Sequence, residues 1–174
     1  DGWGEPSAEN PYFNIEAMHS YNVGSDFNHM QERTQNYVKR VVKHWIEEFH
    51  IDGFRWDLTK GFTQNCPGPD EACTNGYQQD RVDILKEYTD YSWSLDPTHY
   101  TIFEHLGSDI EEKEWANYKI EEGKGIMMWG KTTHAYNQLT MGYGSESDIS
   151  RMGHNAHTGF TGKRVIGYAE SHDE

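Results

Sequence analysis

The chain has 174 residues, a formal net charge of −14 at pH 7 and a mean hydropathy of −0.95. This surplus of carboxylates disfavours nucleic acid and anionic membrane surfaces as partners, because both attract clustered Lys and Arg. No run of residues approaches the roughly 20 apolar positions of a bilayer-spanning helix. The length suits one domain, and we expect no nucleic acid and no membrane among its partners.

Residues 1–30 are rich in Gly, Asn, Pro and Ser without a sustained hydrophobic period, so we expect a long structured loop before the first helix. An amphipathic helix is predicted over 31–49, because apolar residues recur there at spacings of three and four. These apolar residues are Val38, Val41, Val42, Trp45, Ile46 and Phe49. The next stretch, "IDGFRWD", is short and apolar between charges, which predicts a buried strand.

The same alternation continues to the end of the chain. A loop over 63–76 leads to a helix at about 78–95, which Asp96-Pro97 ends. The later predicted elements are a strand at 100–104, an acidic helix at about 109–122, a strand at 125–129, a helix at roughly 132–141, a loop to 162 and a strand at 164–171. Strand–helix alternation is typical of a parallel α/β fold, either an open sheet or a closed barrel. No Gly-rich phosphate loop follows any strand, which disfavours nucleotide binding.

The chain has two cysteines, Cys66 and Cys73, within the loop sequence "CPGPDEAC". This pattern favours a disulfide in an oxidising compartment over two free thiols. A four-ligand zinc site would need further ligands, and the nearest histidines are remote in sequence. A metal site at His154 and His157, in "HNAH", is the alternative, but two histidines alone are weak evidence for one, so both are interpreted as residues of a surface loop.

Three of the four predicted strands end in ionisable residues. Arg55 and Asp57 end the first strand, Glu104 ends the second, and His172 and Asp173 follow the last. In a parallel β/α fold the carboxyl ends of the strands share one rim, and active sites are built there. The alternative is that these are solvated residues flanking strands. Three such strand ends on one rim favour a catalytic site.

The strand-end carboxyl groups are expected to differ in protonation. Arg55 and Asp57 are two residues apart, so they face the same way, and the guanidinium should lower the pKa of the carboxylate. Glu104 ends an apolar strand, where burial should raise its pKa and keep it protonated near neutrality. Two carboxyl groups shifted in opposite directions suit a nucleophile and a general acid. Asp173 would stabilise positive charge that develops on the substrate.

Three segments resemble ordered motifs of one enzyme family. "DGFRWDLTKG" resembles the strand-four motif of the α-amylase family of retaining glycoside hydrolases, "IFEHLG" its strand-five motif and "YAESHDE" its strand-seven motif. The resemblance implies a parallel (β/α)8 barrel, the TIM barrel. Residues 1–174 would form a partial catalytic barrel domain, about half of the barrel, with four β/α units.

The resemblance also implies a role for each matched residue. Asp57 would be the nucleophile that forms a covalent glycosyl intermediate, Glu104 the acid/base, and Asp173 the residue that holds sugar hydroxyls in the transition state. The substrate-binding residues implied by the same motifs are Arg55, His172 and Lys60. The chemistry requires no cofactor.

Two positions depart from the family pattern. Gly61 stands where the family usually has His, so it supplies only a backbone carbonyl, and this position often binds calcium in the family. A structural calcium ion therefore remains compatible with the sequence. Ser171 stands where Asn is common, a variant partly associated with branching enzymes, although "FEHLG" lacks the doubled Glu that is typical of them.

The resemblance leaves three functional hypotheses. The first is an α-amylase-like hydrolase that cleaves α-1,4-glucosidic bonds in starch- or glycogen-type polysaccharides. The second is an α-glucan transglycosylase such as a branching enzyme, with a sugar acceptor in place of water. The third is a non-catalytic glucan-binding fragment, because half the barrel is missing and rings such as Trp56 and Trp129 suit sugar stacking. We expect the rest of the barrel in the same parent chain, and the family resemblance with the two cysteines favours an exported protein.

Overall fold

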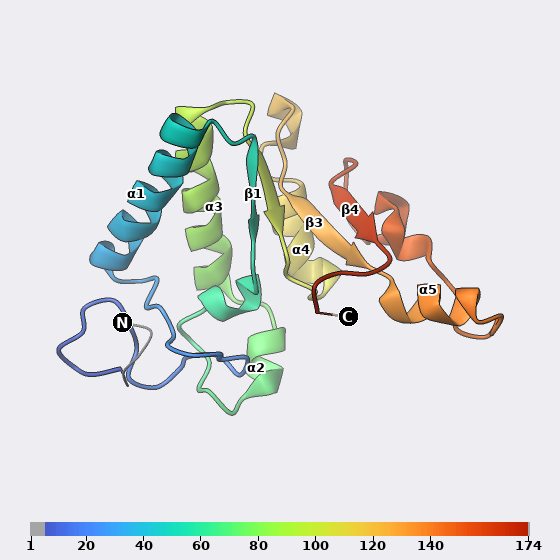
Figure 1. Ribbon diagram of the computed structural model, residues 1–174, viewed down its shortest axis with the longest axis horizontal. Helices are drawn as coiled ribbons and strands as arrows, with labels where there is room; N and C mark the ends of the chain where they lie inside the picture. Colours follow the sequence, from blue (N-terminus) through green and yellow to red (C-terminus); the bar gives the residue numbers. More distant parts are fainter. Residues whose placement is uncertain (1–5, 174) are drawn as a thin grey trace. The chain divides into compact units, whose positions relative to one another are not determined.

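The computed structural model describes residues 6–173, and the chain folds as two compact units (Figure 1). The N-terminal unit extends through Thr101, and the C-terminal unit begins at Ile102. No helix in the described part of the chain is both long enough and apolar enough to span a membrane.

The N-terminal unit alternates helices with strands. Its elements are α1 (Glu32–Phe49), β1 (Gly53–Trp56), the 3-10 helix η1 (Thr59–Phe62), α2 (Glu71–Asn75), α3 (Gln79–Leu95) and the start of β2 (Tyr100–Phe103). The amide of Tyr100 donates to the carbonyl of Asp52 at 2.8 Å, which brings the start of β2 beside β1. A Cβ on residue 53 would lie 2.8 Å from the Cβ of Tyr100, so Gly53 permits this close approach.

The core of the N-terminal unit lies where α1 packs against α3. The apolar face of α1 contributes Val42 and Ile46, and α3 contributes Val82, Leu85 and Tyr88, all buried. Aromatic and imidazole rings extend this core toward the carboxyl end of β1. These contacts are His29 stacked on Phe62 at 4.1 Å, Trp56 stacked on Tyr88 at 5.6 Å and the Tyr88 hydroxyl 3.1 Å from His29 Nδ1.

The C-terminal unit contains the end of β2 and two further parallel strands. Its other elements are α4 (Asp109–Ala116), η2 (Ile120–Glu122), β3 (Met127–Lys131), α5 (Thr133–Thr140), η3 (Ser150–Met152), η4 (His154–Ala156) and β4 (Val165–Tyr168). β2 pairs with β3, and β3 with β4, both in parallel. Phe103, Trp115, Ile126 and Met128 are fully buried and form the core between α4 and the strands. These parallel strands with intervening helices confirm the predicted parallel α/β fold.

Two sequence predictions need correction. The expected helix over 109–122 ends at Ala116, because the Asn117 side chain binds the backbone of Gly159 and Thr161, and Lys119 adopts a left-handed φ of 54° before η2. The expected loop over 63–76 contains α2, whose first turn is capped by the Asp70 carboxylate accepting from the Cys73 amide at 2.8 Å. The predicted Cys66–Cys73 disulfide is present.

Acid should destabilise the N-terminal unit through His29. Burial lowers the pKa of His29 to about 4 from 6.5, although the charge of Asp26 opposes the shift. The neutral imidazole therefore contributes stability above pH 6.5, and this contribution is lost as pH falls from 6.5 through 4. We expect the parent to lose about 3 kcal/mol more unfolding free energy over this interval than His29→Gln.

Urea unfolding at several pH values between 4 and 7 measures the difference. His44→Gln, at an exposed position of α1, is the matched control and should follow the parent. If the unfolding free energies of the parent and of His29→Gln depend equally on pH, His29 is not the source of the acid destabilisation.

Candidate active site

Arg55 and Asp57 form an ion pair at the carboxyl end of β1. The Arg55 guanidinium donates to the Asp57 carboxylate, so the two side chains share one side of the strand as the sequence predicts. The intervening Trp56 points the other way and stacks on Tyr88 in the core. The Asp57 side chain is 67% exposed, which leaves its carboxylate accessible beside a fixed cation.

Lys60 follows in η1, on a loop held by a buried arginine. Its Nζ donates to Asn75 Oδ1 at 2.8 Å and lies 5.2 Å from the ring centroid of Tyr21. The fully buried Arg81, from the first turns of α3, donates to the carbonyls of Lys60 and Thr74 at 2.9 Å each. A third bond, to the carbonyl of Gly76, measures 2.8 Å.

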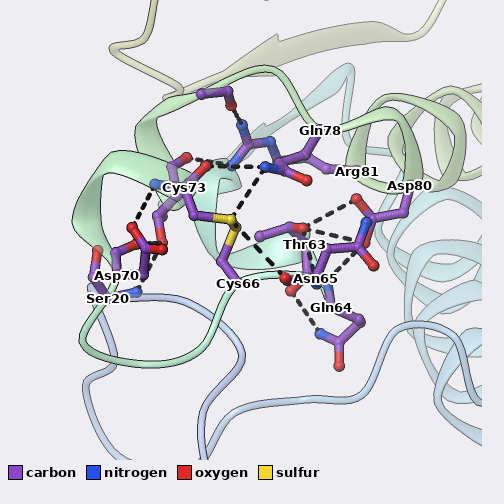
Figure 2. The surroundings of a disulfide bond; sticks show 12 residues. Ser20, Thr63, Gln64, Asn65, Cys66, Asp70, Cys73, Gln78, Asp80 and Arg81 are labelled. Carbon is purple, nitrogen blue, oxygen red and sulfur yellow. Dashed lines mark hydrogen bonds between the residues drawn. A yellow bond between two sulfur atoms is a disulfide. The ribbon is translucent and has the colours of Figure 1, made fainter.

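Figure 2 shows Arg81, Gln78 and Asp80 beside the disulfide. Asp80, next to Arg81 on α3, accepts from the Thr63 hydroxyl at 3.0 Å and from the Gln64 amide at 2.6 Å. Gln78 donates to the carbonyl of Cys73 at 3.0 Å. The start of α3 thus fixes both sides of the disulfide-closed loop. Sequence reasoning missed Arg81 and Asp80, because their partners are mostly backbone groups that leave no side-chain pattern.

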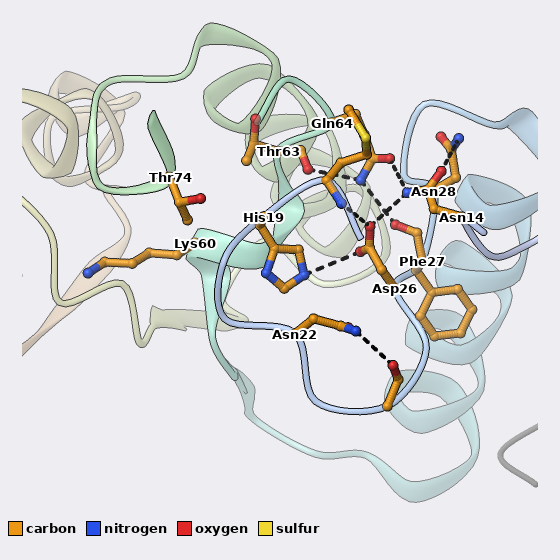
Figure 3. A network of polar contacts seen from close by, with 12 residues as sticks. Asn14, His19, Asn22, Asp26, Phe27, Asn28, Lys60, Thr63, Gln64 and Thr74 are labelled. Atoms are coloured by element: carbon orange, nitrogen blue, oxygen red, sulfur yellow. Dashed lines mark hydrogen bonds and ion pairs between the residues drawn. The ribbon is translucent and has the colours of Figure 1, made fainter. Parts of the chain in front are cut away.

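A polar network behind the loop explains the glycine at position 61 (Figure 3). Asp26 accepts from the Asn14 side chain at 2.7 Å and lies 3.4 Å from His19 Nε2. The buried His19 ring lies against Gly61, where a Cβ would come within 3.1 Å of two ring atoms. The imidazole of residue 19 therefore fills the space that a side chain at position 61 would need.

Glu104 follows β2 directly in the C-terminal unit, and its side chain is buried. The next residues are fixed by acidic side chains of α4. His105 Nε2 lies 2.9 Å from Glu111 Oε2, both side chains being buried, and the Gly107 amide donates to Glu112 Oε1 at 2.9 Å. A Cβ on residue 107 would lie 2.5 Å from the His105 ring, so the loop requires Gly107.

His172 and Asp173 lie beyond the end of β4, with His172 Nε2 3.4 Å from Asp173 Oδ1 and both side chains more than half exposed. The His172 ring lies 6.3 Å from the ring of Trp129, which contacts Tyr168 at 4.6 Å. Strand pairing places Tyr168 opposite Lys131 at the carboxyl ends of β4 and β3. An aromatic surface therefore adjoins the His172–Asp173 pair.

A cavity of about 390 Å³ adjoins the same strand ends in the C-terminal unit. Its lining combines an aromatic ring with charged and small side chains: Leu106, Gly107, Ser108, Asp109, Glu112, Trp129, Lys131 and Arg151. Leu106 and Gly107 belong to the loop after Glu104. A ring beside polar groups suits a polyhydroxylated ligand.

The predicted catalytic residues divide between the two units. Asp57 pairs with Arg55 in the N-terminal unit, whereas Glu104 and Asp173 belong to the C-terminal unit. Within the C-terminal unit Asp173 pairs with His172. Asp57 and Glu104 directly follow β1 and β2, whereas Asp173 lies five residues beyond β4, because the strand predicted over 164–171 ends at Tyr168.

Residues 3–150 match the family described as "Alpha amylase, catalytic domain". This chain belongs to the α-amylase family. Its parallel strands and intervening helices accordingly form part of a TIM barrel, as the sequence predicts.

Known relatives agree with this placement. The chain is 25% identical to a glycogen debranching enzyme from Enterobacter sp. (strain 638) over 87% of its own length and 24% of the relative's. It is 32% identical to the chloroplastic isoamylase 3 of Oryza sativa subsp. japonica over 42% of its length and 8% of that protein's. A pullulanase from Anoxybacillus sp. LM18-11, solved with maltotriose, superposes with a TM-score of 0.54 at 17% identity. That match covers 88% of this chain and 22% of the pullulanase. The chain therefore spans about a quarter of the length of the debranching enzyme and of the pullulanase.

Replacing Arg81 should destabilise the N-terminal unit. Arg81→Met removes charged hydrogen bonds to three carbonyls, and we expect the unfolding free energy to fall by about 2–4 kcal/mol. Arg81→Lys should restore only part of this loss, because an ammonium group lacks the planar fork that reaches several acceptors. Urea denaturation measures the effect. Arg40→Met, at an exposed position of α1, is the matched control, and an equally small effect for both Met variants would refute the role of Arg81.

Proposed function

We propose that this chain carries the catalytic residues of a retaining α-glucan hydrolase. The observation that carries the proposal is the Arg55–Asp57 ion pair at the end of a parallel strand, in a chain of the α-amylase family. The guanidinium holds an exposed carboxylate in place and favours its ionised form, as a nucleophile requires.

Asp57 would attack the anomeric carbon and displace the leaving sugar, giving a covalent glycosyl ester. Glu104 would protonate the departing oxygen and then take a proton from the incoming water. Its burial supports this role, because a low-dielectric environment favours the protonated form of a carboxyl group. Retention needs the two carboxyl groups about 5–5.5 Å apart in the assembled barrel.

Asp173, Arg55, His172 and Lys60 would bind the substrate. Asp173 would hold sugar hydroxyls with a grip that strengthens as positive charge develops on the ring, and His172 would orient it from 3.4 Å away. Lys60 would contact the leaving-group side of the glucan, as the family resemblance implies, and Asn75 and the Tyr21 ring hold its ammonium group. Trp129, beside His172, offers a face for a sugar ring.

The proposed chemistry requires no calcium, and a structural calcium ion stays a prediction of the sequence. Among the described residues, no group of three carboxylate or imidazole ligands converges around the carbonyl of Gly61. The Cys66–Cys73 disulfide supports an oxidising compartment, and with it an exported protein.

The bond that is cleaved has two candidates. The sequence motifs favour α-1,4-glucosidic bonds, whereas the names of the relatives, a glycogen debranching enzyme and a pullulanase, favour branch points. Hydrolysis of linear amylose measures cleavage of α-1,4 bonds, because amylose offers these bonds alone. Release of debranched chains from glycogen measures cleavage at branch points. Constant reducing ends with altered branching would instead indicate a transglycosylase.

Asp57→Asn should abolish hydrolysis, because an amide cannot form the glycosyl ester. We expect reducing-sugar release from soluble starch or glycogen to fall by at least about 1000-fold. Asp83→Asn, at an exposed position of α3, removes the same charge elsewhere and should retain activity.

The intact mass of the purified chain is recorded alongside the reducing-sugar assay. Release by the parent that persists in Asp57→Asn would exclude Asp57 as the nucleophile. No release by the parent at a mass near 20.2 kDa would exclude hydrolysis by this chain alone and favour the non-catalytic glucan-binding alternative.

A further inference from the structure

Three ligand atoms converge beside the cavity of the C-terminal unit. We propose that Asp109, Glu112 and His157 form a binding site for Zn²⁺, which the guanidinium of Arg151 occupies when the metal is absent. One oxygen from each carboxylate and one imidazole nitrogen all lie within 4.8 Å of one another.

The separations are compatible with tetrahedral coordination. His157 Nδ1 lies 3.5 Å from Asp109 Oδ1 and 3.9 Å from Glu112 Oε2. Zinc–ligand bonds of about 2.0–2.2 Å in a tetrahedron place ligand atoms roughly 3.3–3.6 Å apart. The 3.5 Å between His157 Nδ1 and Asp109 Oδ1 already fits this geometry. The widest separation, which is within 4.8 Å, needs to shorten by about an ångström.

The backbone presents these ligands from one helix turn and one loop. Asp109 and Glu112 are three residues apart at the start of α4, so they share one helix face. Glu112 Oε1 accepts from the Gly107 amide, which directs Oε2 of the same carboxylate toward the cluster. Asp109 accepts from the Thr158 amide at 2.7 Å, which ties it to the segment that carries His157.

The orientation of His157 is that of a metal ligand. Its Nε2 lies 3.0 Å from the carbonyl of Arg151, and since a carbonyl only accepts, Nε2 carries the proton. Nδ1 therefore turns its lone pair toward the two carboxylates. A backbone carbonyl on the far nitrogen is the usual way in which proteins fix the tautomer of a ligating histidine. His157 is also buried, so the sequence interpretation of "HNAH" as a surface loop is wrong at this residue.

Arg151 shows that the cluster accepts a cation. Its Nη2 lies 2.9 Å from Asp109 Oδ1 and 3.0 Å from His157 Nδ1. Burial raises the pKa of Asp109, but hydrogen bonds from Arg151 and Thr158 and nearby positive charge outweigh it, so the pKa lies below its usual value. The Arg151 side chain is 44% exposed and lines the cavity, so it can turn to solvent when a metal enters.

The donor set selects the metal. One imidazole with two carboxylates suits Zn²⁺, which takes three protein ligands and leaves a fourth position for water. Calcium prefers six to eight oxygen ligands and does not fit this cluster.

Titration calorimetry of the 174-residue chain with ZnCl2 tests the proposal. We expect one site in the parent, and Arg151→Met should bind Zn²⁺ about fivefold to tenfold more tightly, because the competing half-exposed ion pair is gone. His157→Gln and Asp109→Asn should each weaken binding by about 100-fold. CaCl2 should give no saturable heat at the same site.

Controls separate this cluster from other histidines. His154→Gln, three residues before His157, and His134→Gln, which removes an exposed imidazole 2.6 Å from Glu146, should leave the affinity unchanged. The tighter Zn²⁺ binding expected of Arg151→Met cannot arise from unfolding. Circular dichroism checks that the other variants are folded. The proposal fails if neither the parent nor Arg151→Met binds Zn²⁺ with a Kd below about 100 μM. It also fails if His157→Gln and Asp109→Asn, both folded, bind as the parent does.

Discussion

Polar side chains at the start of a helix fix the loop that precedes it, and the candidate active site depends on this constraint. In the N-terminal unit Asp80 and Arg81 of α3 bind the loop that follows β1 and carries Lys60. In the C-terminal unit Glu111 and Glu112 of α4 bind the loop that follows Glu104. A loop beyond a strand has no ladder bonds of its own, so these contacts satisfy its polar groups and restrict its motion.

The same constraint explains what the sequence could and could not predict. Hydrophobic periodicity predicts α1 and α3, and strand alternation predicts that Arg55 and Asp57 share a side, because both follow from neighbours along the chain. The buried Arg81 and Glu112 resemble ordinary charged residues of solvated helix faces, since their partners are backbone groups reached only through folding. His157 escapes prediction for the same reason, because its contacts with Arg151 and Asp109 join segments up to 48 residues apart.

The matched catalytic residues lie in unlike environments, and this difference agrees with the roles that the family resemblance implies. Asp57 and Asp173 are largely exposed and each lies beside a basic side chain, whereas Glu104 is buried directly after an apolar strand. A carboxylate that must stay ionised is stabilised by water and a neighbouring cation, and a carboxyl group that must carry a proton is favoured by burial. The sequence predicts this contrast for Asp57 and Glu104, because an arginine stands two residues before one and an apolar strand precedes the other.

Glu112 links two features of the C-terminal unit. One of its oxygens accepts from Gly107, in the loop after Glu104, and the other faces His157 and Asp109. Because both oxygens belong to one rigid carboxylate, a cation that draws Oε2 toward the cluster also changes the bond from the Gly107 amide. We therefore expect the occupant of the cluster, a guanidinium or a metal ion, to influence the loop that begins at Glu104 through this one side chain.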